Sequence, residues 1–490
     1  MPLSPAKPVT ISDWRKLVEK ELAGKPFDKV LVHQALEGLS VAPLYTERPD
    51  HRLPPPQGKL WGGGAFRICM RHPAGVDVAT LVADVAQGAD ALWIAGGKIP
   101  DGALEREELK NTSFVLDENV LSTLAYHEAG ADAADEIAIA LSLAVRSLEA
   151  DGTSKPIVQI AVGRDTFVEL CKVRALRVCW QKLLAAAGVR EMPLVHAVCS
   201  SRTLTVRDPW VNMLRVTTQV FSAVLGGADL VTPIAFDTAF GGVPSALGHR
   251  VARNTGLVLR EESFLGKVAD AAGGSYYFET VTDTLAREAW NRFRAIEREG
   301  GIAEAERSGR LAAKFEANWK AQLKAIATRK MPILGVSEFA NLRERLPHPT
   351  PPPGDAGTHR DAAVFEELRA RAEAAGHPPE ALLLTLGSFA ESRPRAGFAA
   401  GFFAAGGISS RESAQDEKAA IVCLCGTDDA YAAEAAERAK KLKAAGCARV
   451  LLAGRPGALE ASLRDAGIDG FIYVGCDAVA ILSALLDGAS

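Results

Sequence analysis

Two histidines lie where an imidazole could act as an acid or a base. His127 stands at a strand–helix border, and His196 lies within the apolar run Leu194–Cys199. Barrel enzymes present catalytic groups from such positions. A hydrogen-bonded structural histidine is the favoured alternative for both, because the nine histidines never cluster at ligand spacing. We therefore assign neither a catalytic residue nor a metal site from the histidines.

Cysteines offer a second candidate chemistry. Cys423-x-Cys425 has the spacing of a tight metal-binding pair, but in a strand both side chains would share one face with no second pair nearby. Core packing is the favoured interpretation. The eight cysteines are scattered and several lie in apolar segments, as expected of a reduced, cytoplasmic protein.

The carboxyl-terminal part of the chain has the layout of a cofactor-binding sheet but contains no histidine. From Leu382 onward, short apolar strands alternate with helices, as in sheets that bind nucleotides or cofactors. No histidine follows His377, and the segment Leu386-Gly-Ser-Phe-Ala-Glu-Ser-Arg-Pro offers no imidazole to a metal. The sequence therefore predicts a binding-type sheet with no cofactor-binding residues.

The absence of common motifs, together with the composition, excludes several classes of function. There is no G-x-G-x-x-G, no complete P-loop, no zinc helix at His127-Glu128 and no G-x-S-x-G. A net charge of −4 and an aromatic content of 6% argue against a nucleic-acid partner. No apolar run is long enough to span a membrane, and the N-terminus lacks a signal core.

The order of predicted elements indicates two α/β domains in the 490 residues. Residues 1–60 form a helix and a proline-rich arm, and residues 61–345 form an incomplete or irregular TIM-type β/α barrel. A proline-rich linker covers 346–360, and a flavodoxin-like doubly wound domain covers 361–490. Apolar runs typical of barrel strands occur at Phe66–Met70, Ala91–Ala95, Ser113–Leu116, Ile157–Val162, Leu194–Cys199 and Leu230–Ile234.

Several stretches resemble the adenosylcobalamin-dependent methylmalonyl-CoA mutase family, specifically its small (beta) subunit. They are Pro43-Leu-Tyr-Thr, Tyr126-His-Glu-Ala-Gly-Ala-Asp, Arg207-Asp-Pro-Trp-Val-Asn-Met-Leu-Arg, Gly226-Gly-Ala-Asp, Phe236-Asp-Thr-Ala, Ala252-Arg-Asn-Thr, Asp270-Ala-Ala-Gly-Gly-Ser-Tyr-Tyr-Phe-Glu and Ile296-Glu-Arg-Glu-Gly-Gly. The resemblance implies a barrel that threads a CoA ester along its axis and a second domain that holds cobalamin.

This chain departs from the active members of the family at its candidate sites. Aligned on Gly387, their Gly-x-Asp-x-His-x-x-Gly motif places Phe389, Glu391 and Pro394 at its aspartate, histidine and last glycine. The family's catalytic histidine falls on Ala125, and its segment with a substrate-facing tyrosine is missing. The resemblance thus implies a degenerate cobalamin domain, with adenosylcobalamin expected only in a partner subunit.

The barrel is also short, because about 32 residues separate Ile94 from Tyr126 where the family places several βα units. We expect a non-catalytic small subunit whose partner is the large (alpha) subunit, and Tyr45 and Arg48 are candidate interface residues. Two alternatives stay open. One is a freestanding homodimeric scaffold or pseudoenzyme, and the other is a divergent acyl-CoA mutase that retains CoA or cobalamin binding through His127 or His196.

Overall fold

The computed structural model describes residues 9–35, 39–47, 66–151, 156–190, 192–241, 243–347, 359–375 and 379–488. The chain divides into two compact units. The first consists of Met1–Cys199, Thr217–Pro233 and Arg253–Asn318, and the second of Ser200–Val216, Ile234–Ala252 and Trp319–Ser490. Each unit is built on a parallel sheet.

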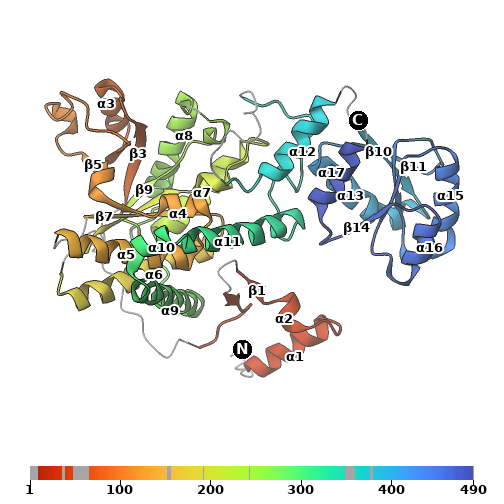
Figure 1. The fold of residues 1–490 in the computed structure, drawn as a ribbon, viewed down its shortest axis with the longest axis horizontal. Coiled ribbons are helices and arrows are strands. Elements are labelled where there is room, and N and C mark those ends of the chain that lie inside the picture. The colour runs from red at the N-terminus through yellow and green to blue at the C-terminus, as the bar shows by residue number, and fades with distance from the viewer. Residues whose placement is uncertain are drawn as a thin grey trace, which may run out of the picture. The chain divides into compact units, whose positions relative to one another are not determined.

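The first unit contains a nearly closed parallel barrel, which confirms the expected fold (Figure 1). Its seven strands have the spatial order β5-β4-β3-β9-β8-β7-β6. Their bounds are β3 (Arg67–Pro73), β4 (Ala91–Ala95), β5 (Ser113–Leu116), β6 (Val120–Ser122), β7 (Ile157–Val162), β8 (Leu194–Cys199) and β9 (Leu230–Thr232). Only six stand out in the sequence, because β6 has the sequence Val-Leu-Ser and lies in no longer apolar run.

The barrel has an open seam between β5 and β6. Most consecutive strands are separated by at least one helix, but these two are joined only by the 3-10 turn Asp117–Asn119. Within the described residues, β5 pairs only with β4 and β6 only with β7. A βα unit needs roughly 30 residues, so no strand-and-helix pair can fit in this connection.

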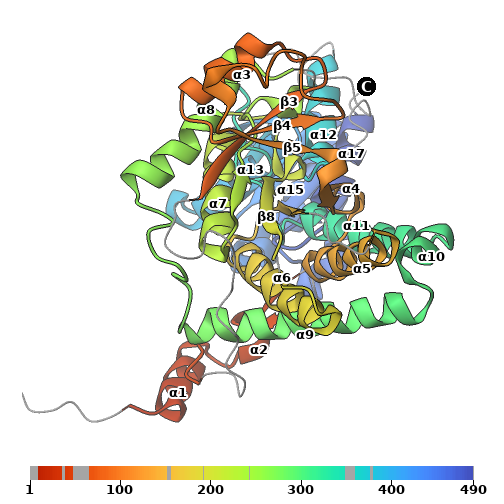
Figure 2. The same ribbon diagram turned by 90° about the vertical axis from the view of Figure 1, so that its left-hand side faces the viewer.

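Helices cover the outside of the barrel. α5 (Ala133–Asp151) and α6 (Thr166–Ala187) follow β6 and β7, and α9 (Tyr276–Arg298) packs against both (Figure 2). α6 begins where the Asp165 carboxylate accepts bonds from two backbone N–H groups, and it ends at Gly188, whose φ is 70°. Further α-helices between residues 66 and 327 are α3 (Val78–Ala86), α4 (Leu124–Ala129), α7 (Val211–Gly226), α8 (Ala246–Leu257), α10 (Gly301–Arg307) and α11 (Arg310–Ala327).

Side chains fill the axis of the barrel. Alternate residues of the strands form one buried apolar cluster, made of Cys69, Ala91, Trp93, Val115, Ile157, Val198 and Leu230. The Trp93 ring meets the His196 ring edge-on with 5.8 Å between centroids, and the Arg71 guanidinium lies 5.0 Å from the indole centroid. The axis is therefore packed around an indole ring.

The N-terminal segment forms α1 (Ile11–Glu21), α2 (Phe27–Val30) and an antiparallel pair of short strands, β1 (His33–Gln34) and β2 (Ser40–Val41). Thr10 and Asp13 form a capping box at the start of α1. None of the eleven residues of α1 is buried. No helix among the described residues has the length and apolar character that crossing a membrane requires.

The second unit contains a five-stranded parallel sheet in the order β11-β10-β12-β13-β14, which is the flavodoxin-like order and confirms the predicted doubly wound fold. Its strands are β10 (Glu380–Thr385), β11 (Ser409–Ser413), β12 (Ile421–Cys425), β13 (Arg449–Ala453) and β14 (Gly470–Ile472). Only the polar edge strand β11 is absent from the sequence prediction, because it lacks an apolar run.

Both faces of this sheet are covered. Leu383 joins an apolar core with residues of α12 (Ala363–Ala374), α13 (Phe389–Ala405) and α17 (Ala478–Asp487). Its neighbours Leu382 and Leu384 join the opposite core with α15 (Ala436–Ala444) and α16 (Glu460–Asp465). A short helix, α14 (Asp428–Ala430), follows β12, and the side chain of Thr427 caps its N-terminus by accepting a bond from Ala430 N–H.

Candidate functional site

His127 lies in a buried ion cluster just beyond the carboxyl end of β6. Its Nδ1 is 3.0 Å from Oε1 of Glu136, a residue of α5. Lys172 of α6 donates to the same oxygen at 2.8 Å, and its Nζ also lies 2.6 Å from Oε2 of Glu169. Gly163 lies directly against this cluster. A Cβ at this position would lie 2.7 Å from the Glu169 carboxylate.

The cluster balances its charges internally. Burial alone would raise the pKa of Glu136, but the charges of Lys172 and His127 outweigh it and lower that pKa to about 2. Burial raises the pKa of Glu169, although Lys172 opposes the shift. The two carboxylates in turn raise the pKa of Lys172 against the effect of its burial. His127 is therefore held in a buried ion network, and its structural role stays a prediction.

Sequence reasoning missed Glu136, Glu169 and Lys172. The available signal is the helix Thr166–Ala187, where charged residues interrupt an otherwise apolar segment. Arg174 and Arg177 belong to the same set, and both are fully buried. Arg174 Nη2 lies 3.0 Å from Asp270 and 3.2 Å from Glu279, and Arg177 Nη2 lies 2.6 Å from Asp229.

His196 lies inside the barrel with its ring held on both sides. Its Nε2 is 2.7 Å from Thr232 Oγ1, and its Nδ1 is 3.2 Å from the Gln159 amide nitrogen. Burial lowers the pKa of His196 to about 3, because the interior disfavours the imidazolium. Its two ring nitrogens thus link three strands of the barrel, which supports a structural role.

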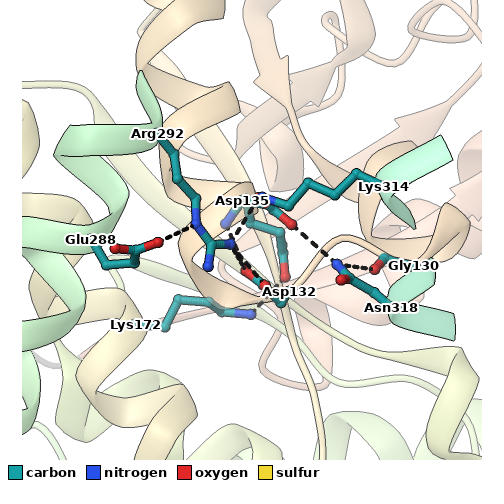
Figure 3. A network of polar contacts seen from close by, with 9 residues as sticks. Gly130, Asp132, Asp135, Lys172, Glu288, Arg292, Lys314 and Asn318 are labelled. Atoms are coloured by element: carbon teal, nitrogen blue, oxygen red, sulfur yellow. Dashed lines mark hydrogen bonds and ion pairs between the residues drawn. The ribbon is translucent and has the colours of Figure 1, made fainter. Parts of the chain in front are cut away.

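A second polar network fixes the start of α5 (Figure 3). Arg292 of α9 donates to Asp132 at 2.6 Å and to Asp135 at 2.9 Å. Asp135 also pairs with Lys314 and accepts a bond of 3.2 Å from the Asn318 amide, both on α11. These contacts join α5, α9 and α11.

Gly130 allows these helices to approach closely. It ends α4 with a φ of 111°, and its carbonyl accepts a 3.2 Å bond from Asn318 (Figure 3). A Cβ at this position would lie 2.6 Å from the Phe315 carbonyl oxygen. Any larger residue would therefore push α11 away.

The second unit has a topological switch point between β10 and β12, where sheets of this order bind ligands. The chain there runs from Gly387, with a φ of 78°, directly into α13. Glu391 is engaged as the second half of a capping box, since it accepts bonds from Ser388 N–H at 2.9 Å and from Ser388 Oγ at 2.6 Å. Those bonds lower the pKa of the exposed Glu391 carboxyl.

The other two substituted positions of this loop are also helical. Phe389 is the first residue of α13 and is 70% exposed. Pro394 lies inside the helix, where it has no N–H to donate. The structure therefore brings Phe389, Glu391 and Pro394 into the first turns of one helix.

Arg395, which follows Pro394 in α13, reaches across the switch point to the segment after β12. It donates to the Gly426 carbonyl at 2.8 Å and to Asp428 Oδ1 at 2.5 Å, and its guanidinium lies 4.8 Å from the Tyr431 ring centroid. Tyr431 donates to the Ala453 carbonyl at 2.6 Å. Side chains of this chain thus occupy the space beyond β10, β12 and β13.

The remaining candidates have local contacts. Cys423 and Cys425 belong to the core under α13, and burial raises the pKa of the Cys423 thiol. The Tyr45 hydroxyl accepts a 3.0 Å bond from Ala42 N–H, and its ring meets the ring of Tyr277 on α9 edge-on with 5.3 Å between centroids. Arg48 lies outside the described residues.

Comparison with known proteins identifies the family. A family model described as methylmalonyl-CoA mutase matches residues 116–391. A methylmalonyl-CoA mutase small subunit of Streptomyces virginiae is 33% identical, with 98% of this chain and 96% of that protein covered. The chain belongs to the methylmalonyl-CoA mutase family. The alignment with the Streptomyces relative runs over 602 positions against the 490 residues of this chain, so that relative has segments lacking here.

Other similar relatives are also small subunits. A probable methylmalonyl-CoA mutase small subunit of Mycobacterium tuberculosis strain H37Rv is 38% identical over 74% of this chain and 63% of its own length. The small subunit from Propionibacterium freudenreichii subsp. shermanii is 34% identical over 74% of this chain and 61% of its own length. The match thus spans less than two thirds of these two relatives.

Replacing Lys172 should test the ion cluster. Lys172→Met leaves Glu136 and Glu169 buried without their cation, so we expect it to lower the free energy of unfolding by about 3–5 kcal/mol. The matched control is Arg464→Met, whose partner Glu460 is about half exposed, as is Arg464; it should cost less than about 1 kcal/mol. Equal urea-unfolding midpoints for the two variants would contradict the assignment.

The low pKa of His196 predicts a pH dependence of stability. Between its unfolded value of 6.5 and its folded value of about 3, the unfolded chain binds the extra proton, so stability falls as the pH falls. At about 1.4 kcal/mol per pH unit, this histidine should account for roughly 2–3 kcal/mol between pH 6.5 and pH 4.5. We expect His196→Gln to lose that part of the slope in urea unfolding; an unchanged slope would contradict the prediction.

Proposed function

We propose that this chain is the non-catalytic small subunit of an adenosylcobalamin-dependent methylmalonyl-CoA mutase. Its large (alpha) partner would hold the cofactor and interconvert methylmalonyl-CoA and succinyl-CoA, an isomerase reaction of propionate metabolism. The observation that carries the proposal is the use of Glu391 as a helix cap at the position of the metal ligand. Glu391 accepts two hydrogen bonds from Ser388 and offers no imidazole to cobalt.

We infer that the second unit does not hold cobalamin. Three features support this: the engaged carboxylate of Glu391, the helical Pro394, and Arg395 spanning the switch point to Gly426 and Asp428. The sequence provides no histidine after His377. These residues do not fit a corrin that requires an imidazole ligand and room for its nucleotide tail.

The packed axis of the barrel supports the absence of substrate binding by this chain. Trp93 and the apolar cluster around it occupy the line along which the family is expected to thread a CoA ester. His196 is held by Thr232 and Gln159, and His127 by Glu136. Neither histidine is therefore proposed as a catalytic residue.

The N-terminal segment supports a subunit partner. Val9, Ile11, Leu17 and Val30 are exposed large apolar residues on or beside α1 and α2. Such a group on an otherwise polar segment is typical of a protein–protein interface. We propose that this segment contacts the large subunit in a cytoplasmic complex, where the eight buried cysteines, which take part in no disulfide, stay reduced.

Co-expression with a large subunit that carries the complete cobalamin motif tests this proposal. We expect a 1:1 complex on size-exclusion chromatography, with mutase activity that requires the large subunit. Leu17→Glu should weaken the complex at least tenfold, because it places a charge on the exposed apolar side of α1. Ser12→Glu, which adds the same charge at an exposed polar position of α1, is the control. A stable homodimer that forms no complex with the large subunit would contradict the proposal.

Restoring the ligand type alone should not restore the cofactor. We expect Glu391→His to leave the visible spectrum of added cobalamin unchanged, because Pro394 and Arg395 still occupy the loop and the switch point. The large subunit serves as the positive control. A base-off, histidine-on spectrum with the variant would overturn the assignment of a degenerate site.

A further inference from the structure

A groove lies between α6 and α9, two helices that pack against each other on the outside of the barrel (Figure 2). It has a volume of about 420 Å³, which lies within the range of small-molecule pockets. Its lining consists of Val178, Cys179 and Lys182 from α6, and Asp283, Ala286, Arg287, Trp290, Asn291 and Arg294 from α9. The proposed function makes no use of any of these residues.

The helical repeat produces the groove. Trp290 and Asn291 lie three and four residues after Arg287, and Arg294 lies four and three residues after them, so the four residues share one side of α9. The floor has small side chains, since Cys179 and Ala286 meet there and the Cys179 thiol donates to the Ala286 carbonyl at 3.4 Å. Long polar side chains thus surround a shallow apolar floor.

The groove has an excess of positive charge. Its one carboxylate, Asp283, is already bonded to Arg287 at 2.8 Å. Lys182 lies with its ammonium 4.4 Å from the Trp290 ring centroid. Arg294 is exposed and forms no ion pair with a carboxylate among the described residues. Lys182 and Arg294 therefore leave two positive charges without a neutralising carboxylate.

We propose that this groove binds a phosphorylated small molecule of nucleotide size. Guanidinium and ammonium groups are the side chains that recognise phosphate, and Arg294, Lys182 and Arg287 provide both types around one hollow. The apolar floor and the edge of Trp290 provide a surface for the non-phosphate part. This site is independent of cobalamin and of the mutase reaction.

Calorimetric titration of the full-length chain tests the proposal. The ligands are ADP, pyrophosphate and adenosine, each in low salt and in 150 mM KCl. We expect ADP and pyrophosphate to bind and to weaken with salt, and adenosine to bind at least tenfold more weakly than ADP. Adenosine binding as tight as that of ADP, or no binding of ADP at all, would overturn the proposal.

A charge-reversal variant locates the binding. Arg294→Glu should raise the Kd for ADP at least tenfold, because it replaces a guanidinium that donates hydrogen bonds to phosphate by a carboxylate that repels phosphate. Arg190→Glu is the matched control, since Arg190 is exposed just beyond α6 and does not line the groove; its Kd should stay within twofold. Circular dichroism confirms that both variants are folded. Equal effects of the two substitutions would show that ADP binds elsewhere.

Discussion

The buried charges of α6 are the constraint on which the first unit depends. Glu169, Lys172, Arg174 and Arg177 lie within a mostly apolar helix. Glu169 pairs with Lys172 of the same helix, and the three cations also pair with carboxylates on other parts of the chain. A charge without a partner in such surroundings costs several kcal/mol, whereas a paired one costs much less. These pairs therefore require α5, the start of α9 and the edge of β9 to take particular positions around α6.

Polar and apolar interactions are divided between the outside and the inside of the barrel. The helices outside are held by ion networks, such as the one that joins Arg292 to Asp132 and Asp135 (Figure 3). The axis is filled by an apolar cluster around Trp93, with His196 held neutral between Thr232 and Gln159. This arrangement favours rigid packing over access for a ligand, which agrees with the supporting role that we propose.

The second unit has the architecture of a ligand-binding sheet, but the side chains at its switch point form contacts within the domain. Glu391 and Ser388 start α13, and Arg395 joins that helix to the segment after β12. Each interaction uses a group that could otherwise face a cofactor. The same residues thus stabilise the domain, which supports the proposal that this unit holds no cobalamin.

The sequence predicted the features that depend on residue type and on local periodicity. Four strands of the second sheet appear as apolar runs, because an apolar run is a local property of the sequence. The absence of an imidazole after His377 is likewise readable without a structure. The capping role of Glu391 also follows a local pattern, Ser-x-x-Glu at 388–391, which the sequence analysis did not use. Only the tertiary structure revealed β6 and the partners of Glu136 and Lys172, because these depend on contacts between residues far apart in the chain, which leave no periodic signal in the sequence.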